Sequence, residues 1–163
     1  MMYIEFLENL DKRLEEYFLA HKKYIHCKKG CSSCCEKGDY PLSQIELEYL
    51  MQGFVKLSNE EKIKVQNNIK KIQKGGICPF LIDKECSIYP YRPIVCRVHG
   101  IAYICKNNTV KVPFCVNTGM NYSDVYNSGK ININPVLENL DTKNVLKDFE
   151  FGEIKNLIDW LNI

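Results

Sequence analysis

Nine cysteines, an odd number, lie in the middle of this 163-residue chain and are the sequence feature that constrains its fold most. An odd set cannot be fully paired in disulfides, and clustered thiols in a cytosolic chain are typical of metal ligands. The sequence therefore predicts a fold organised around a metal-binding centre, with disulfides or inert buried thiols as the alternatives. The cysteines are Cys27, Cys31, Cys34, Cys35, Cys78, Cys86, Cys96, Cys105 and Cys115.

Charge and hydropathy predict a cytoplasmic protein. The chain has 22 basic and 20 acidic residues, a formal net charge of +2, and such a balance argues against coating nucleic acid or an anionic membrane. No apolar run reaches the roughly 18 residues of a membrane span. Acidic residues recur through the N-terminal segment, so it lacks the apolar region of a signal peptide. We expect no nucleic-acid or membrane partner; a small-molecule or protein partner remains unknown.

Apolar spacing predicts a mainly α fold, in a small single domain over residues 1–163. Apolar residues recur every three or four positions over residues 3–24, which indicates an amphipathic helix. Two further helices are expected after Ser43 and Ser58, because each serine opens a Ser-x-x-Glu capping box followed by apolar residues at helical spacing.

The C-terminal part of the chain returns to a helical pattern. Pro135 suits the start of a helix, and apolar residues at helical spacing predict C-terminal helices over 135–162. Between the helices, the segments 101–104 and 110–114 flank a polar turn and predict one short β-hairpin. Amphipathic helices would thus bracket the cysteine-rich metal-binding centre, which spans residues 27–115.

The cysteines fall into two sets. The first, over residues 27–35, has spacings of four, three and one, so several sulfurs can converge on one inorganic centre. The second is spread more widely, with prolines at positions 79, 90 and 93 that restrict the backbone around it. Such restriction suits ligands that must be in place before the metal arrives. The second set comprises Cys78, Cys86, Cys96 and Cys115.

These motifs carry a resemblance to a known family. CxxxCxxCC at 27–35, CPFL at 78–81 and CSIYPYRPIVCR at 86–97 together resemble the YkgJ-type cysteine-cluster family. Its members are described as zinc- or iron-chelating domains, and related sequence occurs in flagellin lysine-N-methylases. The resemblance implies eight metal ligands: Cys27, Cys31, Cys34, Cys35, Cys78, Cys86, Cys96 and Cys115. This chain departs from the family pattern in the spacing of its first two cysteines and in the extra thiol Cys105.

Ligand spacing favours a [4Fe–4S] cluster over Zn²⁺. Structural zinc sites typically take two closely spaced cysteine pairs, and the second set contains no such pair. The adjacent Cys34 and Cys35 suit a cluster better than one ion, because neighbouring side chains diverge. The favoured function is an iron–sulfur protein with a redox or cluster-dependent enzymatic role. A zinc-stabilised, non-catalytic binding module and a metal storage or delivery protein remain the alternatives.

Residues around the cysteines have less defined roles. Arg92 and Arg97 are candidates for hydrogen bonding to the ligand sulfurs, with plain surface exposure as the alternative. His99 follows Cys96 closely enough to be an alternative ligand, although a structural or surface histidine is favoured. Cys105 is left open as a ligand. No catalytic triad, phosphate-binding loop or characteristic pair of carboxylates is recognisable, so no enzyme class is assigned.

Overall fold

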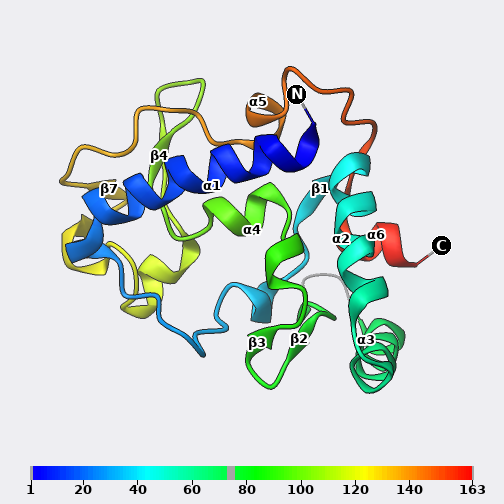
Figure 1. Ribbon diagram of the computed structural model, residues 1–163. Coiled ribbons are helices and arrows are strands. Elements are labelled where there is room, and N and C mark those ends of the chain that lie inside the picture. The colour runs from blue at the N-terminus through cyan, green and yellow to red at the C-terminus, as the bar shows by residue number, and fades with distance from the viewer. Residues whose placement is uncertain (1, 73–75, 163) are drawn as a thin grey trace. The chain divides into compact units, whose positions relative to one another are not determined.

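The protein is described by a computed structural model that covers residues 2–72 and 76–162 (Figure 1). Within this part of the chain, the α-helices are α1 (Tyr3–Ala20), α2 (Gln44–Lys56), α3 (Asn59–Lys71), α4 (Ile94–Val98), α5 (Thr142–Val145) and α6 (Leu157–Leu161). The strands are β1 (Pro41–Ser43), β2 (Leu81–Ile82), β3 (Glu85–Cys86), β4 (Tyr103–Ile104), β5 (Val110–Lys111), β6 (Tyr126–Asn127), β7 (Lys130–Ile131) and β8 (Ile154–Asn156). The mainly α fold predicted from the sequence is confirmed.

The chain divides into two compact units, each built from two separate segments. Unit 1 contains Met1–Cys27 and Arg97–Asp141, and unit 2 contains Lys28–Cys96 and Thr142–Ile163. Each unit is described by itself below. The expectation that residues 1–163 form a single domain stays a prediction.

Two helices of unit 2 begin as the sequence predicts. Ser43 and Ser58 precede α2 and α3, and each forms a capping box with the glutamate three residues later. The side chain of Ser58 accepts a hydrogen bond from the backbone N–H of Glu61, which satisfies a donor at the start of α3. The Ser43–Glu46 box differs, because the carboxylate of Glu46 is completely buried.

A long-range strand pair closes unit 2. β1 and β8 pair antiparallel, with Pro41 opposite Asn156 and Ser43 opposite Ile154. The indole N–H of Trp160 in α6 donates to the carbonyl of Leu42 at 3.1 Å, which fixes the last helix against β1. The buried core of unit 2 comprises Leu42, Leu50, Val65, Phe80, Ile88 and Leu157.

Unit 1 is built on the apolar face of α1. Leu7, Leu10 and Leu14 are buried along this face, at the spacing that predicts an amphipathic helix. Arg97 is also buried and forms an ion pair with Asp11 of α1. Plain surface exposure, one alternative from the sequence, is therefore wrong for this arginine, which ties the segment after residue 96 to α1. Its hydrogen bonding to a ligand sulfur stays a prediction.

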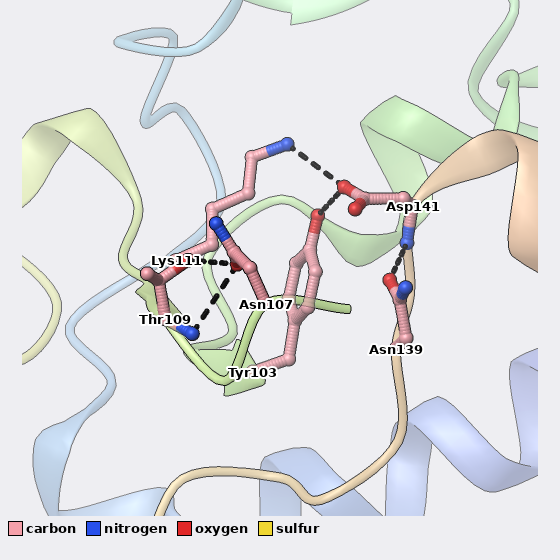
Figure 2. A network of polar contacts seen from close by, with 6 residues as sticks. All are labelled: Tyr103, Asn107, Thr109, Lys111, Asn139 and Asp141. Carbon is pink, nitrogen blue, oxygen red and sulfur yellow. Dashed lines mark hydrogen bonds and ion pairs between the residues drawn. The ribbon is translucent and has the colours of Figure 1, made fainter. Parts of the chain in front are cut away.

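A polar network holds the β4–β5 hairpin of unit 1 (Figure 2). The hydroxyl of Tyr103 donates to Asp141 at 2.8 Å, and the ammonium group of Lys111 lies 3.3 Å from the same oxygen. At the turn, the N–H and hydroxyl of Thr109 both donate to the side-chain oxygen of Asn107. The single hairpin predicted between residues 101 and 114 is confirmed, and the described residues also contain the hairpins β2–β3 and β6–β7.

The helical prediction for 135–162 is wrong over most of its length. Only α5 and α6 are α-helical there. Pro135 does not begin a helix, because Val136 forms a parallel β-bridge to Tyr103. The N–H of Val136 donates to the carbonyl of Ala102 at 3.1 Å, so the backbone groups that a helix would use are engaged elsewhere. Tertiary pairing has overridden the local pattern.

Candidate metal centre

Two backbone hydrogen bonds in unit 2 bring the first cysteine set to Cys78. The N–H of Cys78 donates to the carbonyl of Cys35 at 2.7 Å, and the N–H of Gly38 donates to the carbonyl of Gly76 at 2.9 Å. The two segments approach so closely that a Cβ at Gly38 would lie 2.4 Å from the Cβ of Cys78. Only glycine has no atom there, so Gly38 permits this approach. The hydroxyl of Tyr40 also donates to the carbonyl of Cys34 at 3.0 Å, which holds the same segment.

The β2–β3 hairpin brings Cys86 back toward Cys78. Cys86 pairs with Leu81 across the hairpin, and the N–H of Leu81 donates to the carbonyl of Cys78 at 3.0 Å. The turn residues Asp83 and Lys84 both have positive φ, 50° and 64°, the backbone conformation of a tight two-residue hairpin turn. A chain reversal therefore brings Cys86 back toward Cys78, although the two residues lie eight positions apart in the sequence.

Cys96 lies on the short helix α4, which follows Pro93. The N–H of Cys96 donates to the carbonyl of Pro93 at 3.0 Å, within the first turn of this helix. Before it, the segment Tyr89–Tyr91 forms a 3₁₀ turn that contains Pro90. Proline fixes φ at both positions, so the path from Cys86 to Cys96 is restricted, as the sequence predicts.

The electrostatic interactions of unit 2 connect five thiols, which we call the thiol group. Each is half-buried and interacts electrostatically with at least one other member. Cys34 interacts with every other member, because it affects the pKa of each of the other four. The thiol group comprises Cys34, Cys35, Cys78, Cys86 and Cys96.

The adjacent pair Cys34 and Cys35 is polarised. A hydrogen bond from the Cys35 thiol lowers the pKa of Cys34 to about 6, although burial opposes this shift. The same hydrogen bond raises the pKa of Cys35, and burial raises it further. Within this pair Cys34 is the thiolate and Cys35 the proton donor. A thiolate is the form of cysteine that binds a metal.

Burial dominates the pKa values of the other three thiols. It raises the pKa of Cys78 to about 12 and also raises the pKa values of Cys86 and Cys96. The positive charge of Arg92 counters this trend by lowering the pKa values of Cys34, Cys86 and Cys96. A metal ion would be a larger positive charge at the same place, and its binding would displace the protons of the buried thiols.

Arg92 is itself held in place by Tyr89. Its guanidinium group stacks on the Tyr89 ring at 3.5 Å from the centroid, and its Nε donates to the Tyr89 carbonyl at 2.9 Å. A planar guanidinium fits such stacking better than an ammonium group does. From the sequence, Arg92 is a candidate neighbour of the ligand sulfurs. Its electrostatic effect on three thiols supports a place beside them.

Three of the eight ligands implied by the resemblance lie outside the thiol group. Cys31 belongs to unit 2, where its thiol lies 3.8 Å from the hydroxyl of Ser33. Cys27 and Cys115 belong to unit 1. Cys27 is exposed and its sulfur accepts a hydrogen bond from Asn121 at 3.0 Å, whereas Cys115 is buried. Their role as ligands stays a prediction.

The two open residues also lie in unit 1. Cys105 contacts Asp141, and burial followed by this carboxylate raises the pKa of its thiol. His99 packs against the ring of Phe114, with the ring centroids 5.3 Å apart, and burial lowers its pKa. Neither residue belongs to the thiol group.

The donor set of the thiol group fits a soft or borderline metal. All five donors are sulfur, which selects zinc, copper(I) and iron–sulfur clusters over magnesium or calcium. Across residues 2–72 and 76–162, no three histidine, cysteine, aspartate or glutamate side chains are arranged as ligands of one metal ion. The thiols therefore lie within electrostatic reach of one another without forming the tight shell of a single ion.

Sequence reasoning missed two residues that organise this region, Gly38 and Glu46. Nothing in the sequence marks Gly38 beyond its place three residues after Cys35. Glu46 does carry a signal, since it is the acidic member of a capping box, but that motif predicts only a contact within its own helix.

Soft donors on converging backbone segments define a cysteine-rich metal-binding domain. Residues 26–116, more than half of the chain, match the model of the CxxCxxCC family, described as a "putative zinc- or iron-chelating domain". The chain belongs to this family. No curated protein and no solved structure gives a significant match. In the described ranges, none of the helices is both long and apolar enough to cross a membrane.

Proposed function

We propose that unit 2 binds a [4Fe–4S] cluster through the thiol group, with Cys34, Cys78, Cys86 and Cys96 as ligands. The observation that carries this proposal is the backbone geometry that brings these separate segments together: the N–H of Cys78 donates to the carbonyl of Cys35, and the β2–β3 hairpin returns Cys86 toward Cys78. The effects of the thiols on one another's pKa values agree with it. Four thiolates are the complement of such a cluster. Membership of a family of zinc- or iron-chelating domains supports the same conclusion.

The arrangement of the thiols favours a cluster over a single zinc ion. With Zn–S bonds of about 2.3 Å in a tetrahedron, the four sulfurs of a zinc site lie roughly 3.8 Å apart. The described part of the chain has no three side chains grouped to hold one ion, although the thiols interact over a longer range. A cube of iron and sulfide ions is larger and spans more widely placed thiolates.

The residues around the thiols have defined tasks in this proposal. Arg92 supplies positive charge that offsets the thiolates, and its stacking on Tyr89 keeps that charge in place. Burial of the thiols limits access of water, which tunes the reduction potential of an iron–sulfur centre. When bound, such a cluster supplies electron transfer or, at an iron with an open position, a site for substrate. Cys35 is a fifth thiol beside this set.

Metal and sulfide analysis of protein purified without oxygen tests the proposal. We expect a brown protein with about four iron atoms and four acid-labile sulfide ions per chain. Replacing Cys78 or Cys96 by serine should abolish the colour. A colourless protein with one zinc ion per chain would refute the cluster and favour the zinc-stabilised binding module. Several loosely held ions released by a mild chelator would instead indicate metal storage or delivery.

Cys27, Cys31 and Cys115 enter the proposal as further candidates from the family resemblance. Serine variants at these positions are made in the same way and assayed for iron and sulfide. A variant that loses iron identifies a ligand outside the thiol group, whereas unchanged iron content in all three restricts the ligands to the thiol group.

A further inference from the structure

Glu46 is a completely buried acidic residue that links two helices of unit 2. One carboxylate oxygen accepts hydrogen bonds from the N–H of Ser43 at 2.7 Å and from its hydroxyl at 2.6 Å. The other oxygen accepts from the N–H of Ile94 at 2.7 Å. Ile94 is the first residue of α4 and lies 48 positions further along the chain. Glu46 therefore caps its own helix and a second helix at the same time.

The second helix needs this cap from elsewhere. The first N–H groups of a helix have no partner within it and are usually satisfied by the side chain of the preceding residue. The residue before α4 is Pro93, whose side chain contains no hydrogen-bond acceptor. Because α4 has only five residues, it is too short to be stable without tertiary contacts.

We infer that Glu46 is a positioning residue for the metal centre, because it fixes the helix that carries Cys96. This inference rests on the proposed function, since it takes Cys96 to be a ligand. The chain of contacts is direct: Glu46 holds the N–H of Ile94, and Cys96 lies two residues later in the same helical turn. Ile94 is itself completely buried, so the anchor point has little freedom to move.

The chain contains a matched control in the second capping box. Glu61 has the same relation to Ser58 as Glu46 has to Ser43, with contacts of 2.9 and 2.7 Å to the N–H and hydroxyl. This second box lies on the exposed surface of unit 2. A change at Glu61 perturbs only the start of α3. The same change at Glu46 perturbs the start of α2 and also alters the carboxylate that accepts from the N–H of Ile94 in α4.

The experiment compares Glu46→Gln and Glu46→Ala with Glu61→Gln and Glu61→Ala. The first readout needs no metal: the rate at which iodoacetamide alkylates each cysteine of the metal-free protein, resolved by peptide mass spectrometry. We expect Cys96 to react faster in the Glu46 variants, while Cys78 keeps its rate. The second readout is the iron and acid-labile sulfide content after anaerobic reconstitution, which should fall in the Glu46 variants, because residues that orient metal ligands typically raise metal affinity about 10- to 100-fold.

The outcomes distinguish a failure of the inference about Glu46 from a failure of the proposed function. Unchanged alkylation of Cys96 and unchanged iron content in the Glu46 variants that fold would overturn the inference. Equal losses in the Glu61 variants would also overturn it, because they would reflect helix capping in general. If the reconstituted wild-type protein holds no iron–sulfur cluster, the proposed function fails, but the alkylation of Cys96 still tests whether Glu46 positions it. Should Glu46→Ala not fold, Glu46→Gln carries the comparison, since it preserves size and one acceptor oxygen.

Discussion

Replacing Gly38 by alanine tests directly how the thiol group is assembled. Gly38 has φ −85° and ψ 21°, a conformation open to any residue. The requirement for glycine is therefore steric and comes from Cys78. An added Cβ would lie 2.4 Å from the Cβ of Cys78 and 2.8 Å from its backbone N and Cα. The clash involves backbone, so rotation of a side chain does not relieve it.

The size of the stability loss follows from how far the Gly38 and Cys78 segments must separate. Ordinary contact begins at 3.4 Å, so relief of the 2.4 Å approach needs a separation of about 1 Å between the two segments. Overpacking of this kind costs roughly 1–3 kcal/mol. The two backbone hydrogen bonds between the segments would stretch, at about 1 kcal/mol each. Alanine also lowers the conformational entropy of the unfolded chain, which offsets about 0.4–1 kcal/mol of the stability loss. We expect a net loss of about 2–5 kcal/mol in unfolding free energy.

The assay combines urea denaturation with the iron content of anaerobically purified protein. Gly152→Ala is the control, because it lies in the same unit, has a positive φ of 71° that strains an alanine, and its Cβ would meet the side chain of Gln44 at 2.8 Å. Both variants should lose stability, but only Gly38→Ala should lose iron as well. If Gly38→Ala has wild-type stability and iron content, the close approach to Cys78 does not organise the site and the reasoning is refuted.

Three other predictions concern single perturbations. Cys105→Ser should leave the iron content unchanged, because Cys105 lies with Asp141 outside the thiol group; loss of iron would make it a ligand. Asp141→Asn should lower the unfolding free energy by about 1 kcal/mol at pH 7. Burial raises the pKa of Asp141, but hydrogen bonds from Tyr103 and Lys111 outweigh burial, so the pKa is lowered overall. The stabilisation that ionised Asp141 contributes is therefore present above pH ~4 and is lost as the pH falls through the lowered pKa of Asp141. Urea titrations should show the two proteins converging toward pH 3, and a constant difference would contradict this. Chelation of the metal should lower the melting temperature of the wild-type protein, because metal binding contributes folding free energy; an unchanged melting temperature would show that the centre is not structural.

Local signals in the sequence were sufficient for the first three helices. The apolar spacing of α1 and the capping boxes at Ser43 and Ser58 act over one or two turns, so the sequence contains all that determines them. The pattern failed at Val136, where the structure satisfies the backbone through Ala102 and Tyr103 instead. Propensity is a weak prior that tertiary pairing can override.

The candidate site could be predicted as a set of residues but not as an arrangement. Cysteine spacing indicated two sets of ligands, yet it could not place Cys31 outside the thiol group or Cys115 in the other unit. The approach of Cys35 to Cys78 depends on the glycine at position 38, a contact between segments about 40 residues apart in the sequence. A single sequence carries no signal for such a contact.

The pairing of β1 with β8 has a consequence for synthesis on the ribosome. Pro41 and its neighbours are translated long before Asn156, their partner in the antiparallel ladder. Every cysteine of unit 2 emerges before this last strand does. A nascent chain can therefore present all its unit 2 thiols to a metal donor while β1 is still an unpaired edge. Exposure of these thiols therefore precedes closure of the unit during translation.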